Sequence, residues 1–309
     1  MSEKTARAVR FDQYGGPEVL YIAEVPMPVP ASGEVVVEVR ATATNPGEAS
    51  IRSGAFMPGS SAFPSGQGSD LAGVVSDVGD GVTEFAAGDE VLGFSVRRSS
   101  HATHVAVPTS QVIHKPSQLG WPVAGSLYVA GVTAYAAVRA VDPRPGETVA
   151  VSAAAGGVGT VVVQLLRSRG VHVLAIASPA NADWLTEHGA TPVPYGDGLA
   201  DRLTAAAPDG IDAFIDLFGP EYLQLAVDLG IPRDRIETII SFELAERLGT
   251  KHEGSMDAST KEVLTEMADL IASGEIEIPI AATYPLDQVA EAFRELERRH
   301  TRGKIVLIP

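Results

Sequence analysis

The feature that most constrains how this chain can fold is a glycine-rich turn between a strand-forming and a helix-forming stretch. Residues 149–151 are small and β-branched, and residues 161–166 are mostly apolar. The turn between them has the spacing G-x-G-x-x-G of dinucleotide-binding proteins, with Ala154, Gly156 and Gly159 at the three fixed positions. We expect Gly156 to let the backbone approach a pyrophosphate and Gly159 to let the helix pack closely on its strand. The helix N-terminus would then present N–H groups and a positive dipole end to the phosphates. A tight turn that binds nothing is the alternative.

The segment that follows bears on which cofactor is bound. Residues 171–177 are apolar almost throughout, as in a parallel strand buried on both faces. An NAD-binding protein usually carries an acidic residue at the end of this strand for the ribose 2′-hydroxyl, whereas this chain has Ser178 and Asn181. A carboxylate would repel a 2′-phosphate, but a hydroxyl and an amide can donate hydrogen bonds to it. The segment therefore favours NADPH, although it contains no arginine or lysine. Ser178 could also cap the next helix, and the two roles are compatible.

Composition bounds the class of protein. A chain of 309 residues fits two domains better than one core. The net charge of −16 argues against binding to nucleic acid or anionic lipid, because a phosphate surface would be repelled. The N-terminus has no apolar signal segment and the chain has no run of eighteen apolar residues, so we expect a cytoplasmic protein with no membrane contact.

The first part of the chain is β in character. Short β-branched stretches separated by glycine and proline predict a small, partly open β-barrel over roughly the first 120 residues. The expected strands are residues 6–11, 20–25, 34–41, 74–79, 87–93 and 104–108.

A series of motifs in one order along the chain carries a family resemblance. The segments are N-P-G-E-A-S-I-R-S-G at 45–54, G-S-D-L-A-G-V-V at 68–75, F-A-A-G-D-E-V at 85–91, A-G-V-T-A-Y at 130–135, A-A-A-G-G-V-G at 153–159 and R-G-K-I-V-L at 302–307. Together they resemble the zinc-independent, zeta-crystallin-like quinone oxidoreductases of the medium-chain dehydrogenase/reductase superfamily.

The resemblance implies an α/β fold of two domains. A GroES-like catalytic domain, a partly open β-barrel, would comprise residues 1–123 and 275–309. A Rossmann domain with a doubly wound parallel sheet would be inserted at 124–274. Sequence periodicity agrees where it is informative. It predicts helices at 127–141, 199–206, 260–272 and 289–296, and strands at 148–151, 211–216 and 235–240.

The absence of cysteine bears on the chemistry. Without cysteine the chain has no disulfide, no thiol nucleophile and no thiolate ligand for zinc, so we expect no metal. The seven histidines are scattered, and His101 and His104 would point to opposite faces of a strand. A metal-free reaction would be hydride transfer from a nicotinamide to a quinone or an α,β-unsaturated carbonyl compound, assisted by hydrogen bonds to the developing enolate oxygen.

The resemblance implies that Asn45 and Thr133 border the nicotinamide and the reacting carbonyl group. From the residues alone, Asn45 could instead form an Asx-turn before Pro46, and the Thr133 hydroxyl could bond back to its own helix.

Ser50 is a departure from the family, because several members carry tyrosine at this position. Serine is shorter and a far poorer acid than tyrosine, which puts proton donation by the enzyme in doubt and leaves solvent as a source. The change also opens space for a bulkier substrate. Arg52 could bind substrate, but pairing with an acidic residue of the barrel is the favoured interpretation.

The candidate residues fall into two sets. The catalytic candidates are Asn45, Ser50, Arg52 and Thr133. The cofactor-binding candidates are Asn45, Thr133, Ala154, Gly156, Gly157, Val158, Gly159, Ser178, Asn181, Tyr195, Phe218, Ser241, Phe242, Gly303 and Lys304. By resemblance Tyr195 would lie against the adenine ribose, and covering the sheet edge is its alternative.

More than one function fits these observations. Reduction of quinones or conjugated carbonyl compounds with NADPH is favoured. A structural or regulatory NADPH-binding protein with little turnover is the first alternative, and reduction of enoyl thioesters in a biosynthetic pathway is the second. The family also suggests a homodimer formed through edges of the Rossmann sheets.

Overall fold

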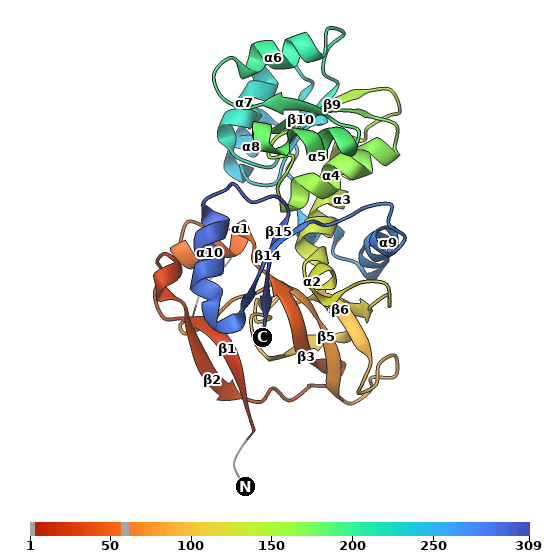
Figure 1. Ribbon diagram of the computed structural model, residues 1–309. Coiled ribbons are helices and arrows are strands. Elements are labelled where there is room, and N and C mark those ends of the chain that lie inside the picture. Colours follow the sequence, from red (N-terminus) through yellow and green to blue (C-terminus); the bar gives the residue numbers. More distant parts are fainter. Residues whose placement is uncertain (1–3, 57–61) are drawn as a thin grey trace. The chain divides into compact units, whose positions relative to one another are not determined.

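The computed structural model describes residues 4–56 and 62–309, and the chain forms two compact units (Figure 1). The first unit comprises the chain up to Val129 together with the segment from Thr260 onward, and the second comprises Ala130–Ser259. The glycine-rich turn lies in the second unit. The motifs at 45–54, 68–75 and 302–307 lie in the first, although the last of them follows the whole second unit in the chain.

The first unit is built on a large, mostly antiparallel sheet in which β3 is central. Along one side β3 pairs with β5, and its other side is shared by β7 and β15. The parallel pair β14–β15 brings the C-terminal segment into this sheet. The strands are β3 (Glu34–Ala43), β5 (Asp70–Val78), β6 (Glu90–Phe94), β7 (His104–Pro108), β8 (Val112–His114), β14 (Ile280–Pro285) and β15 (Lys304–Ile308).

Two of the apolar cores of this unit form around β3 and around β1. The alternating valines Val35, Val37 and Val39 of β3 pack with Leu71 and Phe85 on one side. A second core forms beneath a small sheet of β2, β1 and β4, where Val9 of β1 packs with residues of the C-terminal segment. The small sheet comprises β1 (Thr5–Phe11), β2 (Tyr21–Pro26) and β4 (Ser65–Gly66).

The helices of the first unit are α1 (Pro46–Ser53), α2 (Trp121–Ala124), α9 (Lys261–Ala272) and α10 (Val289–Glu297). Helix α9 was expected within the Rossmann domain, because the sequence analysis placed that boundary at 274. The structure groups α9 with the first unit, where it packs on β8. Its buried stripe includes Val263, Leu264 and Met267, so amphipathicity predicted the helix but could not identify the sheet that it covers.

The second unit contains a five-stranded parallel sheet with the order β11-β10-β9-β12-β13. In chain order this is 3-2-1-4-5, the arrangement of a Rossmann sheet, and the order reverses between β9 and β12. Ile176, Phe214 and Ile236 from three strands meet in its core. The strands are β9 (Thr148–Val151), β10 (His172–Ala177), β11 (Thr191–Pro194), β12 (Ala213–Asp216) and β13 (Ile236–Thr238).

The helices of this unit are α3 (Thr133–Val141), α4 (Gly157–Ser168), α5 (Ala182–Glu187), α6 (Leu199–Ala206), α7 (Pro220–Asp228) and α8 (Phe242–Leu248). The single helix predicted over 127–141 is divided, because residues 128–132 form a π-helical turn before α3. The strand predicted over 235–240 is shorter, since β13 ends at Thr238. Its outer side is covered by Lys251, whose N–H and C=O groups bond to Ile236 and Thr238.

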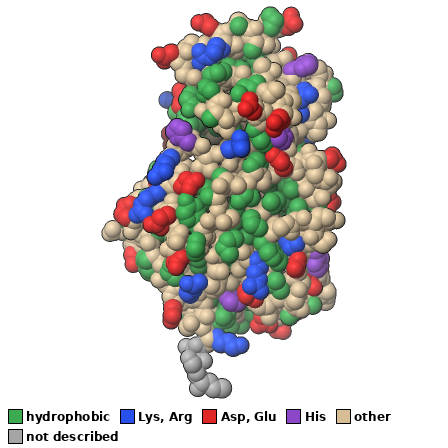
Figure 2. Space-filling view, viewed as in Figure 1, with side chains coloured by type: hydrophobic (Ala, Val, Ile, Leu, Met, Phe, Trp, Pro, Cys, Tyr) green, Lys and Arg blue, Asp and Glu red, His purple; other side chains and the backbone are tan. Residues whose placement is uncertain are grey.

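The surface has no feature of a polyanion-binding protein on the face that Figure 2 shows. There the lysine and arginine side chains are interspersed with acidic ones instead of gathering in one patch. Within the described ranges, none of the helices is both long and apolar enough to cross a membrane.

Candidate functional site

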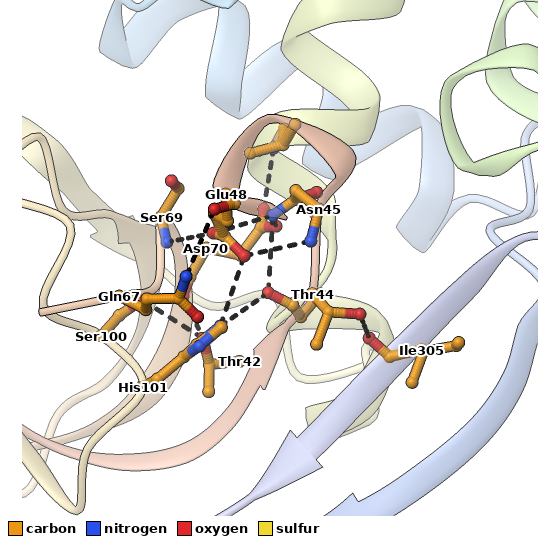
Figure 3. Close-up of polar contacts among 12 residues, drawn as sticks. Thr42, Thr44, Asn45, Glu48, Gln67, Ser69, Asp70, Ser100, His101 and Ile305 are labelled. Atoms are coloured by element: carbon orange, nitrogen blue, oxygen red, sulfur yellow. Dashed lines mark hydrogen bonds and ion pairs between the residues drawn. The ribbon is translucent and has the colours of Figure 1, made fainter. Parts of the chain in front are cut away.

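In the first unit, Asn45 lies at the start of α1 inside a buried polar cluster (Figure 3). Its backbone is extended, and its N–H donates to the Glu48 carboxylate at 3.0 Å, which ties the first turn of the helix. The Asn45 side-chain amide donates to Glu48 at 3.2 Å and to Asp70 at 2.9 Å. Its oxygen accepts from the Lys304 ammonium group. The contacts with Glu48 are local to the first turn of α1, whereas those with Asp70 and Lys304 join distant parts of the chain.

The two carboxylates of the cluster are almost completely buried, with Glu48 3% and Asp70 0% exposed. Buried carboxylates need charged or hydrogen-bonding partners, and both have them. Glu48 accepts from the Ser69 N–H at 2.8 Å, and Asp70 accepts from the Val129 N–H at 2.7 Å. The Lys304 ammonium lies 3.5 Å from Asp70 and is itself only 5% exposed. One cation thus joins β15 to the carboxylate at the start of β5.

His101 completes the cluster on the side of Glu48, as Figure 3 shows. Its Nε2 lies 3.0 Å from the Ala43 carbonyl oxygen and 3.7 Å from a Glu48 oxygen. Its Nδ1 is buried and has no hydrogen-bond partner among the residues that the structure describes. His104 is half-buried at the start of β7 and bonds to Thr103. Over the described part of the chain, no group of three His, Cys, Asp or Glu side chains could hold a metal ion.

Arg52 and Ser50 both lie on α1, but their surroundings differ. Arg52 is 1% exposed, forms an ion pair with Glu297 of α10, and has its guanidinium carbon 4.8 Å from the Phe293 ring centroid. Arg52 therefore has an acidic partner, but on helix α10 and not on the barrel, where the sequence favoured one. Ser50 is half-buried, and its carbonyl oxygen accepts from the Phe56 N–H at 3.1 Å.

Gly303 and Lys304 lie where β15 begins. Gly303 has a φ of +78°, and a Cβ there would lie 2.0 Å from the Pro279 carbonyl oxygen, so only glycine fits. The Lys304 N–H donates to that same oxygen at 2.8 Å. The turn at Gly303 thereby directs the Lys304 side chain to the polar cluster.

In the second unit the glycine-rich turn joins β9 to α4. A Cβ at Gly159 would lie 2.2 Å from the Ala153 carbonyl oxygen, so α4 can begin this close to the turn only with glycine there. The left-handed residue of the turn is Ala153, with a φ of +46°, one position before the Ala154 of the motif. Among the residues that the structure describes, no side chain caps α4 at Gly156, so the first N–H groups of the helix can bind a ligand. Gly157 and Val158 are the first two residues of this helix, and both are half-buried.

Apart from Thr133, the remaining candidates of this unit lie beyond the carboxyl ends of neighbouring strands. Ser178 and Asn181 follow β10, and the Ser178 hydroxyl accepts from the Ala180 N–H at 3.4 Å, so its capping role is present. Tyr195 follows β11 and is 46% exposed. Phe218 follows β12 and packs edge-on against Tyr222, with 5.4 Å between ring centroids.

Ser241 and Phe242 follow β13. Ser241 is 9% exposed, and its hydroxyl oxygen is buried without a hydrogen-bond partner within the described residues. Phe242 begins α8 and is 37% exposed. An unpaired buried hydroxyl at the carboxyl edge of a Rossmann sheet is a position where a ligand atom would supply the missing partner. Thr133 begins α3 in the same unit and is 6% exposed.

Sequence reasoning missed several polar residues that the structure places at these sites. Glu48, Asp70 and His101 surround Asn45, and Asp216 stands at the end of β12 with 0% exposure. Burial raises the pKa of Asp216, against the opposing effect of donors from Phe218, Ser152, Thr238 and Gly219. For Asp216 the available signal was position, since a polar residue that ends an apolar strand lies at the functional edge of a parallel sheet.

The comparisons with known proteins cover almost the whole chain. Residues 31–142 match the family described as alcohol dehydrogenase GroES-like domain, and residues 188–307 match the family described as zinc-binding dehydrogenase. Quinone oxidoreductase of Rattus norvegicus is 31% identical over 98% of this chain and 97% of its own length. Quinone oxidoreductase of Pseudomonas aeruginosa is 31% identical over 98% of this chain and 100% of its own.

Solved structures agree with these relatives. The quinone oxidoreductase of Escherichia coli in complex with NADPH superposes with a TM-score of 0.89 at 27% identity, covering 98% of this chain and 100% of the other. The quinone oxidoreductase of Pseudomonas syringae pv. Tomato DC3000 gives the same TM-score, identity and coverage. The predicted fold class, a GroES-like domain with a Rossmann domain, is thereby confirmed. The chain is an oxidoreductase that belongs to the quinone oxidoreductase family of the medium-chain dehydrogenase/reductase superfamily.

Proposed function

We propose that this protein transfers hydride from NADPH to quinones or α,β-unsaturated carbonyl compounds without a metal ion. The observation that carries the proposal is the carboxyl edge of the Rossmann sheet. There the helix α4 begins with uncapped N–H groups, glycine at 159 is the one residue that fits, and the Ser241 hydroxyl has no partner among the described residues. These features fit a dinucleotide, and the NADPH complex of the Escherichia coli relative supports the choice of ligand.

The preference for NADPH over NADH rests on the end of β10. Ser178 occupies the position where an NAD site would place a carboxylate, and it is half-buried beside Asn181. The nearest acidic residue along the chain is the exposed Asp183, in the first turn of α5. A 2′-phosphate at this position would therefore have the Ser178 hydroxyl and the Asn181 amide as its nearest polar groups along the chain, with the Asp183 carboxylate further on.

NADPH supplies a hydride, and the two-electron reduction of a conjugated carbonyl compound is completed by one proton. The chain contains no cysteine, which removes the thiolate ligands of a catalytic zinc. Delocalisation of charge over a quinone or an enone replaces the Lewis acid in stabilising the enolate. We assign the proton to solvent, because Ser50 is too weak an acid to deliver it.

The role that we propose for Asn45 is steric. Its amide donates to two carboxylates and its oxygen accepts from Lys304, so its hydrogen-bonding groups are engaged within the first unit. Held in this way, the side chain can border the nicotinamide with little freedom to rotate. Thr133 is proposed as a hydroxyl that hydrogen-bonds the reacting carbonyl group.

The test is NADPH oxidation followed at 340 nm with a 1,4-quinone, a simple enone and a saturated aldehyde, and with NADH as the parallel donor. We expect turnover of the first two compounds and none of the aldehyde, with NADPH preferred. Turnover of the aldehyde would contradict the metal-free mechanism. Binding of NADPH without oxidation of any of the three would favour the binding-protein alternative instead.

The homodimer and the cytoplasmic location stay predictions. Proline at 192 and 194 makes β11 a poor edge for pairing, whereas the other edge of the sheet is the segment around Lys251 that covers β13. We therefore propose the β13 side as the dimer interface. Light scattering after size exclusion measures the state directly, and a monomeric mass would contradict it.

A further inference from the structure

A single buried carboxylate connects three neighbouring strands of the Rossmann sheet. One oxygen of Asp216 accepts from the Ser152 hydroxyl at 2.8 Å and from the N–H groups of Phe218 and Gly219 at 3.0 and 3.1 Å. The other oxygen accepts from the Thr238 hydroxyl at 2.8 Å. Ser152, Asp216 and Thr238 are all 0% exposed, and they stand at the ends of β9, β12 and β13.

We call Asp216 with Ser152 and Thr238 the anchor. The hydroxyl groups of Ser152 and Thr238 also bind the loops that follow β12 and β13. The Ser152 hydroxyl accepts from the Leu217 N–H at 2.8 Å, and the Thr238 hydroxyl accepts from the N–H groups of Ile240 and Ser241 at 3.3 and 3.2 Å. The loops after β12 and β13 are therefore both fixed by contacts that lead to Asp216.

The position of the anchor in the sheet bears on its function. The strand order reverses between β9 and β12, and open α/β sheets bind their ligand outside the carboxyl ends of the strands at such a reversal. The bond between Ser152 and Asp216 spans this reversal directly beneath the glycine-rich turn. The anchored loops carry Phe218 and Ser241, and the Ser241 hydroxyl is the buried group that lacks a partner among the described residues.

We propose that Asp216 is the positioning residue for the nicotinamide half of the dinucleotide site, acting through Ser152 and Thr238. The inference rests on the proposed NADPH site. It adds that the two halves of this site are fixed by different means. The adenosine half lies at the end of β10, which makes none of the contacts of Asp216, whereas the nicotinamide half lies on the loops that Asp216 holds.

Thr238→Val provides the sharpest test, because valine keeps the shape of threonine and removes the hydroxyl that joins Asp216 to the loop of Ser241. Dissociation constants are measured for NADPH by fluorescence and for 2′,5′-ADP, the phosphorylated adenosine half, by calorimetry. We expect the constant for NADPH to rise about tenfold and that for 2′,5′-ADP to stay within about twofold. Thr238→Ser should restore NADPH binding, since serine keeps the hydroxyl.

A matched control removes a hydroxyl elsewhere in the same unit. Thr204 is exposed on α6, and among the described residues its hydroxyl bonds to the Ala200 carbonyl oxygen of the same helix, at 2.9 Å. Thr204→Val should bind both ligands as the wild type does. Ser152→Ala removes the other arm of the anchor and provides a second, independent variant if Thr238→Val does not fold.

The outcomes separate the inference from the proposed function. A wild-type protein that binds neither ligand overturns the NADPH site itself. A wild type that binds both, with Thr238→Val and Ser152→Ala binding NADPH equally well, leaves the NADPH site standing and overturns the role of Asp216. Equal weakening of NADPH and 2′,5′-ADP by the variants also overturns it, because general loosening of the unit would then be the cause.

Discussion

Glu237 of β13 shows how one side chain can set the pH dependence of stability. It is 0% exposed, and its carboxylate has no side-chain hydrogen-bond partner within the described chain. Burial raises the pKa of Glu237 from 4.5 to about 9, and the Glu253 charge raises it further while a backbone hydrogen bond and Lys251 oppose the shift. At a pH between 4.5 and about 9, Glu237 is therefore protonated in the folded protein and ionised in the unfolded chain. This contribution to stability is therefore complete below pH 4.5 and is lost as the pH rises to about 9.

Glu237→Gln should stabilise the protein at alkaline pH. Glutamine is neutral at every pH, so the variant escapes the cost of ionising a buried carboxylate. At pH 8 we expect a gain on the order of a few kcal/mol in the free energy of unfolding, since each unit of pKa difference is worth about 1.4 kcal/mol. Urea unfolding at pH 5 and pH 8 measures it, with the exposed Glu246→Gln as control. A gain of the same size at both pH values would speak against burial as its cause.

Gly159 tests the close approach of α4 to the turn. In Gly159→Ala the new methyl group meets a backbone oxygen, so the turn has to shift and its N–H groups move away from the pyrophosphate position. We expect the dissociation constant for NADPH to rise by about tenfold or more. Gly254→Ala is the control, because a Cβ there meets nothing within 4 Å. NADPH fluorescence titration compares the two, and unchanged binding in Gly159→Ala would refute the argument.

At the level of helices and strands, the C-terminal segment holds the first unit together. Helix α10 binds α1 through Arg52, and β15 reaches β3 and supplies Lys304 to the polar cluster. The two contacts fix opposite parts of the same region, since Arg52 lies near the end of α1 and Asn45 at its beginning. Helix α1 is therefore held near both of its ends by residues more than 200 positions away in the sequence, in addition to its contacts with nearer residues such as Ser69 and Asp70.

Arg52→Met should lower stability and leave substrate kinetics unchanged. It removes the contacts to Glu297 and to the Gly15 carbonyl oxygen, and Glu297 is 36% exposed, so its charge can be solvated in part. We expect a loss on the order of 2 kcal/mol, between the values for exposed and buried ion pairs. Arg294→Met on α10, whose ion pair with Glu291 is exposed, should cost little. A higher KM for quinone with unaltered stability would instead assign Arg52 to substrate binding.

Elements and site differ in how far they can be predicted from the sequence. The periodicity of residues 199–206 predicted α6 with its observed ends, because its apolar residues pack locally on the sheet. The glycine motif likewise predicted α4. The polar cluster could not be predicted in this way, because Asn45 and Lys304 are 259 positions apart and no local pattern records their contact. The same holds for Ser152 and Asp216, which become neighbours only when β9 and β12 pair.

For the whole molecule, the division into two units determines where a ligand acts. The glycine-rich turn, Ser178, Tyr195, Phe218 and Ser241 all belong to the unit of residues 130–259. A ligand that binds only the folded form stabilises that form by about 2.7 kcal/mol at a concentration one hundred times its dissociation constant.

NADPH at that concentration should slow hydrogen exchange by about a hundredfold at the most protected amides of residues 130–259. NADH at the same concentration should protect less if Ser178 selects the phosphorylated cofactor. Mass spectrometry of peptides from both units makes the comparison. If NADPH protected the amides of residues 4–56 as strongly as those of residues 130–259, the effect of the ligand would not be limited by the unit boundaries.

The interrupted course of the first unit also bears on how the protein is made. During synthesis β3, β5 and the carboxylates of Glu48 and Asp70 leave the ribosome before the whole of residues 130–259, while β15 and Lys304 leave after it. Until then β3 lacks the strand that pairs with its end, and the Asp70 carboxylate lacks the ammonium group of Lys304. The unit of residues 130–259 is continuous in the chain, so it can fold before the C-terminal segment of the first unit has been synthesised. Translation therefore passes through a stage in which the nucleotide site can already be formed and the surroundings of Asn45 cannot.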